Sequence, residues 1–145
     1  MYSQILFPTD GSECADAAFD HALEHAKTYD ASILALYVAD IREVGHASPA
    51  ISLDRIRDAL HESGNNVLSR IESRAADADV EIETVVSEGT PASEILRHAD
   101  KDGVDLVVMG THGRSGLDRY LIGSVAERVV RGSSAPVLTV RQEST

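Results

Sequence analysis

The fold of this chain is decided by a stretch near its C-terminus, which reads Val104-Asp-Leu-Val-Val-Met-Gly110-Thr-His-Gly113-Arg-Ser-Gly116-Leu-Asp-Arg-Tyr-Leu-Ile-Gly123-Ser124-Val-Ala-Glu-Arg-Val-Val-Arg131. Its first part predicts a buried strand that ends at Gly110, and its last part has the apolar spacing of a helix. The loop between them contains Gly113, Arg114 and Arg119. Glycines let backbone N–H groups approach a phosphate, and a helix N-terminus attracts anions. We therefore expect an anion site here, with Ser124 as the N-cap of the helix.

The rest of the chain alternates between apolar runs typical of strands and the apolar periodicity of helices. Strands are expected at residues 5–7, 33–38, 80–86, 106–109 and 136–140. Helices are expected at about residues 12–30, at 53–75, from 91 to before Gly103 and at 124–131, with a loop at 40–50. This order predicts one α/β domain over residues 1–145, a doubly wound, open parallel five-stranded sheet with helices on both faces.

Two helices carry finer expectations. Gly64 lies within the long helix and is expected to be its weak point, because glycine is a poor helix former. The C-terminal helix is expected to end at Gly132. Its apolar positions predict an inward face of Val125, Ala126, Val129 and Val130.

Composition narrows the class of partner. The chain has 24 acidic and 13 basic residues, only two of them lysines, and a formal net charge of −11. This charge argues against non-specific binding to nucleic acid or to anionic membranes. An acidic, lysine-poor surface favours adaptation to high salt, with an ordinary acidic protein as the alternative.

The location follows from features that the sequence lacks. No segment approaches the roughly 20 apolar residues that span a bilayer. The N-terminus shows neither the basic region nor the cleavage site of a secretory signal. Cys14 is the single cysteine, so it forms no intramolecular disulfide and is expected to pack as a small apolar group. We expect a cytoplasmic protein.

In doubly wound sheets, ligands bind beyond the carboxyl ends of the strands where the strand order reverses. The loops there carry Pro8-Thr9-Asp10, Val38-Ala-Asp40 and the glycine-rich segment. Asp10 has two interpretations: a carboxylate that accepts from a ribose hydroxyl, or a cap or Asx turn for the following helix. His112 is interpreted as a phosphate contact or as an exposed turn residue.

Other nucleotide and catalytic motifs are missing from the sequence. There is no Gly-Lys-Ser/Thr of a P-loop, and no Gly-x-Gly-x-x-Gly follows the first strand. The histidines are scattered, without the clustered cysteines or acids of a metal site. We therefore expect no metal bound by protein side chains, and we assign no catalytic residue.

The chain resembles the ATP-binding branch of the universal stress proteins over nearly its whole length. The matching pieces are Ile-Leu-Phe-Pro-Thr-Asp10-Gly-Ser12, Leu-Tyr-Val38, Glu88-Gly89-Thr-Pro91, Asp105-Leu-Val-Val-Met-Gly110, and the segment from 110 to Val140. The spacing Gly110-x2-Gly113-x9-Gly123-Ser124 is similar to the ATP-binding signature of that family. Residues 40–65 match least.

The resemblance implies a sheet order of 3-2-1-4-5 and ATP, or ADP or AMP, as ligand, with or without Mg²⁺. It implies that Asp10 contacts the ribose, that Val38 contacts the adenine through its backbone, and that Gly89 lies at the adenine end. Other implied roles are a floor of Pro8 and Thr9, a ribose and phosphate side of Met109, Gly110 and Gly113, and distal phosphate contacts from Gly123, Ser124 and Val125. His112 and Arg114 join this set as phosphate-side candidates from the residues alone.

The resemblance also implies a homodimer through the last strand, 136–140. The residues support this separately, because Val137, Leu138 and Val140 on an edge strand would otherwise be left as an unprotected template. The function expected is that of a nucleotide-dependent regulator or stress-survival factor. The alternatives are a slow ATPase and an interaction module in which the nucleotide is purely structural. The ATPase needs a metal-holding group and a positioned water as well as a phosphate cradle.

Overall fold

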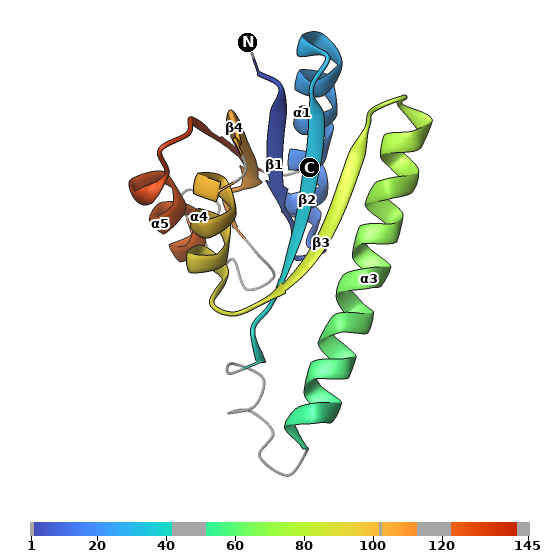
Figure 1. Ribbon diagram of the computed structural model, residues 1–145, viewed down its shortest axis with the longest axis vertical. Coiled ribbons are helices and arrows are strands. Elements are labelled where there is room, and N and C mark those ends of the chain that lie inside the picture. The colour runs from blue at the N-terminus through green and yellow to red at the C-terminus, as the bar shows by residue number, and fades with distance from the viewer. Residues whose placement is uncertain (1, 42–51, 102, 113–122, 142–145) are drawn as a thin grey trace.

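A parallel five-stranded sheet in the order β3-β2-β1-β4-β5 forms the centre of the computed structural model (Figure 1). The structure describes residues 2–41, 52–101, 103–112 and 123–141. The strands are β1 (Gln4–Pro8), β2 (Ser32–Ala39), β3 (Ile82–Glu88), β4 (Leu106–Gly110) and β5 (Val137–Val140). The predicted α/β class, parallel sheet and strand order are confirmed.

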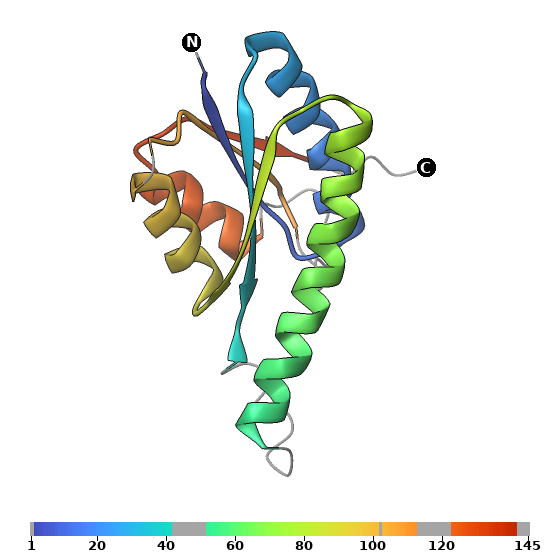
Figure 2. The same cartoon turned by 45° about the vertical axis from the view of Figure 1, so that its right-hand side comes forward.

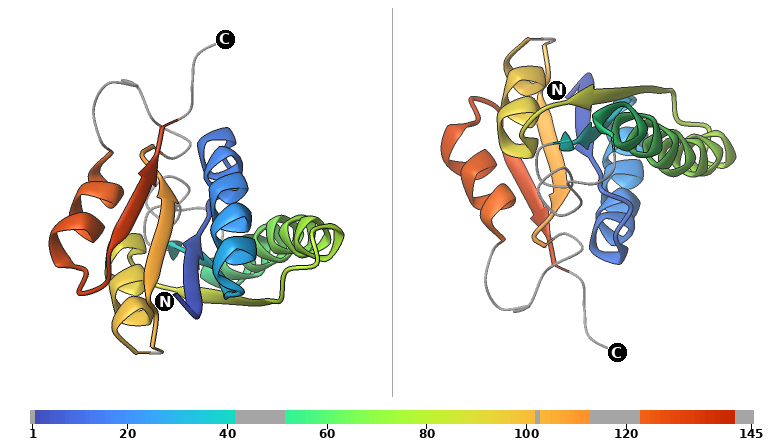
Figure 3. Two further views of the ribbon diagram at one scale, coloured as in Figure 1. Left: turned by 90° about the horizontal axis from the view of Figure 1, so that it is seen from above. Right: turned by 90° about the horizontal axis from the view of Figure 1, so that it is seen from below.

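Helices cover both faces of the sheet, as Figures 2 and 3 show. The helices α1 and α3 lie on one face, and α4 and α5 lie on the other. Their bounds are α1 (Glu13–Tyr29), α3 (Leu53–Asp77), α4 (Pro91–Lys101) and α5 (Ser124–Gly132). Within the described ranges, none of these helices combines the length and the apolar character needed to cross a bilayer.

The central strands are apolar on both sides because each face of the sheet has its own core. In β1, Ile5 and Phe7 pack with Phe19 and Ile71 against α1 and α3. The residue between them, Leu6, packs in the second core under α4 and α5. Alternate side chains of one strand thus hold the two helical layers to the same sheet.

The third strand begins two residues later than expected. Val80 is buried, as expected for an apolar residue of the core. It is not part of the strand, because its N–H donates to the carbonyl of Ala75 at 2.9 Å at the end of α3. Asp79 beside it has a left-handed backbone with φ of 58°. The chain therefore turns at 79–80, and pairing with β2 starts at Ile82. The expected loop at 40–50 lies largely outside the described residues, which omit 42–51.

The inward face of α5 is narrower than expected. Ala126 and Val129 are buried, Val125 is half-buried, and Val130 is 46% exposed, so its placement inward was wrong. The helix α5 ends at Gly132, as expected. A Cβ on Gly132 would lie 2.9 Å from Cδ1 of Leu96, so this glycine lets α5 approach α4 closely.

Gly64 is a point of close contact rather than the weak point predicted. The helix α3 runs unbroken through it, and a Cβ built there would lie 2.6 Å from Cδ1 of Tyr37 on β2. The ring of Tyr37 thus takes the place that a side chain at position 64 would need. The missing side chain lets α3 lie directly on the sheet.

We expect Gly64→Ala to lower the free energy of unfolding by about 1–3 kcal/mol, the usual effect of overpacking a core. The direction is diagnostic, because Gly→Ala inside a helix ordinarily stabilises by about 0.5–1 kcal/mol. Urea denaturation measures the change. The matched control is Asn65→Ala on the exposed face of the same helix, which should not destabilise the protein. A Gly64→Ala protein as stable as wild type would contradict the close contact.

Candidate functional site

The strand order reverses between β1 and β4. From β1 the chain moves outward to β2 and β3, and it then crosses back to β4 and β5. The segment after β1 enters α1 on one face of the sheet, whereas α5 follows β4 on the other. Such a reversal opens a crevice at the carboxyl ends of the strands. Figure 1 shows β2 and β3 side by side as parallel strands, with α3 beginning near the carboxyl end of β2.

The segment after β1 is held by short-range hydrogen bonds. The hydroxyl of Thr9 accepts from the N–H of Gly11 at 3.1 Å, and Oδ1 of Asp10 accepts from the N–H of Ser12 at 3.0 Å. Ser12 is the N-cap of α1, and its hydroxyl accepts from the N–H of Ala15 at 3.2 Å. Asp10 therefore makes an Asx turn, as one interpretation expected, but it does not cap the helix. These bonds fix Asp10 at the carboxyl end of β1.

The N-terminus of α5 is tied to the end of β4 by one backbone hydrogen bond. The N–H of Gly123 donates to the carbonyl of Thr111 at 2.7 Å. Gly123, not Ser124, is the N-cap, because its own carbonyl accepts the first helical bond, from Glu127 at 3.0 Å. The prediction of Ser124 as the cap was therefore wrong. Ser124 is the first helical residue, is exposed, and follows a cap that has no side chain.

Two glycines of the predicted signature are required by the protein's own packing. A Cβ on Gly110 would lie 2.8 Å from Sγ of Cys14, and one on Gly123 would lie 2.8 Å from the carbonyl oxygen of Thr111. Gly123 has φ of −65°, so it is not a residue that needs a left-handed backbone. A larger residue at Gly123 would disturb the helix start as well as any ligand.

Thr111 is a residue of this region that the sequence reasoning missed. It is only 5% exposed, its N–H donates to the carbonyl of Val140 at 2.9 Å, and its hydroxyl lies 3.0 Å from Nδ1 of His112. Cys14 lies beneath it and donates to the same Val140 carbonyl at 3.5 Å, which confirms its packing role. The sequence could have pointed to Thr111, because it is a hydroxyl residue between the end of a buried strand and the candidate residue His112.

The ends of β2 and β3 are clamped at Gly89. The N–H of Gly89 donates to the carbonyl of Ala39 at 3.1 Å, and φ of Gly89 is +148°, a backbone that other residues rarely adopt. The side chain of Glu94 folds over this glycine, since a Cβ there would lie 2.9 Å from Cγ of Glu94. Arg97, 2.8 Å away, and the hydroxyl of Ser87 donate to the Glu94 carboxylate and hold its pKa below the ordinary value.

The carboxyl end of β3 is also joined to α3. Oε1 of Glu88 accepts from Nε of Arg57 at 2.9 Å and lies 2.9 Å from Nε2 of His61. The hydrogen bond with His61, together with the charge and hydrogen bond of Arg57, lowers the pKa of Glu88 and outweighs the opposing effect of desolvation. These contacts hold the first turns of α3 beside the same edge of the sheet.

The fold brings nearly all the predicted site residues to one edge of the sheet. They are Pro8 at the end of β1 with Thr9 and Asp10 after it, Val38 on β2, Gly89 after β3, Met109 and Gly110 on β4 with His112 after it, and Gly123, Ser124 and Val125 at the start of α5. Pro8, Thr9 and Met109 are buried, and the others are half-buried or exposed. Gly113 and Arg114 lie outside the described residues. Among the residues that are described, no three histidine, cysteine or acidic side chains gather as metal ligands.

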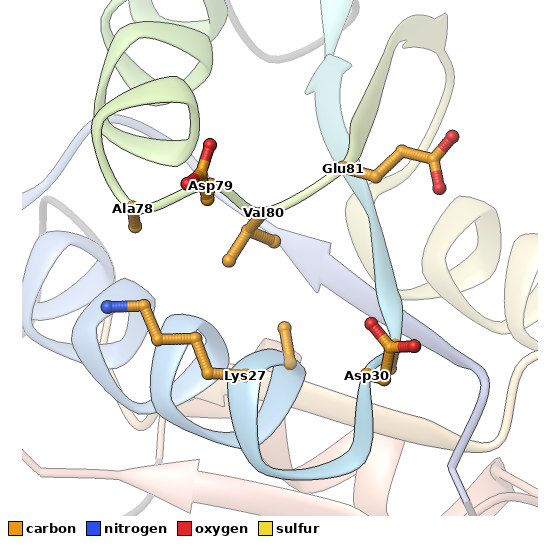
Figure 4. Close-up of a pocket in the computed structure, with 8 residues that line it drawn as sticks. Lys27, Asp30, Ala78, Asp79, Val80 and Glu81 are labelled. Carbon is orange, nitrogen blue, oxygen red and sulfur yellow. The ribbon is translucent and has the colours of Figure 1, made fainter.

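A pocket of about 310 Å³ lies at the opposite end of the sheet (Figure 4). It is lined by the ends of α1 and α3 and by the approach to β3, including Lys27, Asp30, Asp79 and Glu81. None of the predicted site residues lines it. We therefore place the candidate site at the carboxyl ends of the strands and not in this pocket.

The lowered pKa of Glu94 predicts a stability difference that depends on pH. A carboxyl with a lowered folded pKa stabilises above its unfolded pKa, and this contribution is lost as pH falls through the folded value. We expect Glu94→Gln to cost about 1–2 kcal/mol at pH 7 and clearly less near pH 3. Chemical denaturation of both proteins at the two pH values measures it. Glu127→Gln, which breaks the exposed pair with Arg131, is the control and should cost little. A Glu94→Gln penalty independent of pH would contradict the charged clamp.

Comparison with known proteins agrees with the fold and with the resemblance of the sequence. The model of the universal stress protein family matches residues 1–141. Universal stress protein MJ0531 of Methanocaldococcus jannaschii is 41% identical over 98% of this chain and 84% of its own length. The solved structure of MJ0577, from the same organism, superposes with a TM-score of 0.89 at 32% identity, covering 100% of this chain and 99% of that one. A universal stress protein solved in complex with cAMP superposes with a TM-score of 0.76 at 26% identity, covering 98% and 99%. A match over almost the full length, by sequence and by structure, places this chain in the universal stress protein family.

Proposed function

We propose that this protein binds an adenine nucleotide, with ATP preferred, at the carboxyl ends of β1, β2 and β4, and acts as a nucleotide-dependent regulator or stress-survival factor. The observation that carries the proposal is the start of α5. Gly123 has no side chain to cap the helix, and its bond to Thr111 holds the N–H groups of Ser124 and Val125 beside β4. Such a helix start binds phosphate. The relative solved in complex with cAMP supports an adenine nucleotide as the ligand.

The adenosine half of the ligand would lie across β1 and β2. In this proposal Asp10, fixed by its Asx turn, accepts from a ribose hydroxyl, and the backbone of Val38 meets the adenine. Gly89 closes the adenine end, where its left-handed backbone and the Glu94 side chain set the shape of the turn. Pro8 and Thr9 form the floor beneath.

The phosphate half would lie between β4 and α5. Met109, Gly110 and Gly113 would line the ribose and the first phosphate, with His112 and Arg114 toward the phosphates. The N–H groups of Ser124 and Val125 would donate to the distal phosphates, and Gly123, whose own N–H is bonded to Thr111, would let them approach because it has no side chain. This is why ATP should bind more tightly than AMP. Mg²⁺ would arrive bound to the phosphates. Production of ADP from Mg-ATP at saturating concentration would instead favour the slow ATPase.

Replacing Ser124 by proline tests the helix start directly. Proline is well tolerated at the first helical position, and Gly123 already has the extended backbone, φ −65° and ψ 162°, that a residue before proline adopts. Ser124→Pro should therefore keep the fold and remove one N–H donor. We expect ATP binding to weaken by about tenfold or more, the effect of losing one hydrogen bond to a charged group. Isothermal titration calorimetry measures it.

Ser124→Ala is the matched control, because it removes the hydroxyl and keeps the N–H. It should bind ATP nearly as wild type does. If Ser124→Pro binds ATP normally, the phosphates do not lie on this helix start. If the wild-type protein binds neither ATP, ADP nor AMP, the proposed function fails as a whole.

We also propose a homodimer through the edge strand β5. The hydrogen bonds from Val107 N–H to Pro136 and from Thr111 N–H to Val140, each 2.9 Å, turn the backbone groups of the even-numbered residues toward β4. In a parallel pair the odd-numbered residues then face away. Val137 and Thr139 thus present their N–H and carbonyl groups at the open edge, which a second copy of β5 can pair.

Thr139→Pro should convert the dimer to a monomer, because it removes an outward N–H without breaking a bond to β4. Wild-type dimers should tighten as salt rises, since each chain carries a formal charge of −11 and screening weakens their repulsion. Sedimentation velocity at low and high salt measures both effects. Thr84→Pro, on the opposite edge strand β3, is a control that should leave the dimer intact. If the Thr139→Pro protein still forms a dimer, the interface does not include β5.

A further inference from the structure

The imidazole of His112 is held at one nitrogen by a buried hydroxyl. Nδ1 lies 3.0 Å from the hydroxyl of Thr111, which is itself buried between β4, β5 and α1. The opposite edge of the ring faces the start of α5, because Cδ2 lies 3.8 Å from the position of a Cβ on Gly123. Cδ2 is bonded to Nε2. The ring is therefore anchored through Nδ1, and Nε2 lies on the side of the proposed phosphate site.

The donors around Thr111 can be assigned so that each is used once. Cys14 donates its S–H to the carbonyl of Val140 at 3.5 Å, so its sulfur lies 4.0 Å from Thr111 Oγ1 with its proton directed elsewhere. The Thr111 hydroxyl then has two acceptors within reach, Cys14 Sγ at 4.0 Å and His112 Nδ1 at 3.0 Å, and it is assigned to the nitrogen, which is nearer and a stronger acceptor than sulfur. In a neutral imidazole one nitrogen accepts and the other carries the proton. An accepting Nδ1 requires an N–H at Nε2.

Thr111 is a rigid support for this arrangement. Its N–H is bonded to Val140 and its carbonyl to Gly123, so its backbone is fixed on both sides. Its β-branched side chain has few accessible χ1 states. The absence of a side chain at Gly123 leaves the space that the Thr111 carbonyl and His112 occupy.

We propose that Thr111 is a positioning residue that fixes His112 in the Nε2–H tautomer and directs that N–H to a phosphate of the bound nucleotide. This inference rests on the proposed function and adds a source of ligand specificity. The Thr111–His112 pair favours phosphorylated adenosine over adenosine itself. A neutral Nε2–H donates to an anionic oxygen, whereas a neutral Nε2 without a proton would face the phosphate with a lone pair.

The first experiment reads the tautomer directly. Long-range ¹H–¹⁵N correlation spectra of the wild-type protein at neutral pH, assigned with His112→Gln, should show the Nε2–H form of His112. The Nδ1–H form overturns the proposal, because Thr111 would then accept from the ring and Nε2 would lack a proton. This measurement needs no nucleotide, so its outcome is independent of whether the proposed function holds.

The second experiment measures ATP and adenosine affinities for matched variants. Thr111→Val should weaken ATP binding by about tenfold and leave adenosine binding within about twofold, because the lost support acts on phosphate alone. Thr111→Ser, which keeps the hydroxyl, should restore ATP binding. Thr84→Val makes the same change on β3, where the hydroxyl bonds to Glu72, and should change neither affinity.

Two substitutions of His112 distinguish the roles of its two ring nitrogens. His112→Gln places an amide N–H near the position of Nε2 and should retain more ATP affinity than His112→Asn, whose amide lies near Nδ1. Equal ATP-to-adenosine ratios in wild type and Thr111→Val overturn this proposal and leave the proposed function standing. Absence of any nucleotide binding by the wild-type protein overturns both.

Discussion

The hydrogen bond from Gly123 N–H to the Thr111 carbonyl is the constraint on which this edge of the molecule depends. It brings the start of α5 back to the end of β4 across eleven intervening residues of sequence. At 2.7 Å it leaves no space for a side chain at position 123. Thr111 in turn is fixed by Val140, so the end of β5 is part of the same arrangement. One backbone contact thus links the helix start, the central sheet and the edge strand.

The helices α1 and α5 both begin at this edge of the sheet, but the polar groups at their starts differ. On the α1 side, Ser12 caps the helix and Asp10 takes a further N–H, so side-chain oxygens already occupy these donors. On the α5 side, the cap is a glycine without a side chain. A carboxylate therefore stands on one side and helix N–H groups on the other. This polarity supports a ligand whose hydroxyls lie toward β1 and whose phosphates lie toward α5.

Much of the fold could be predicted from the sequence, because each element carries its own local signal. Apolar runs marked the strands, and helical spacing marked the helices; the strand order came from the family resemblance. What could not be predicted were contacts between distant segments. From the sequence alone, Gly64 is a poor helix former and Gly123 is a phosphate-binding glycine. The structure adds that each leaves room for a distant residue, Tyr37 beside Gly64 and Thr111 beside Gly123. Thr111 itself has no motif, because its role depends on neighbours from β5 and α1.

The proposed anion site conflicts with the acidic composition only if the charge is treated as uniform over the protein. The formal charge of −11 acts over the range of the Debye length, about 10 Å at 0.1 M salt and about 3 Å at 1 M. Hydrogen bonds from backbone N–H groups and from an imidazole act at contact distance and are screened much less. The acid nearest the start of α5 along the chain, Glu127, is paired with Arg131 at 2.9 Å. The proposed cradle of backbone N–H groups, the His112 imidazole and Arg114 uses no lysine, so it suits a lysine-poor chain.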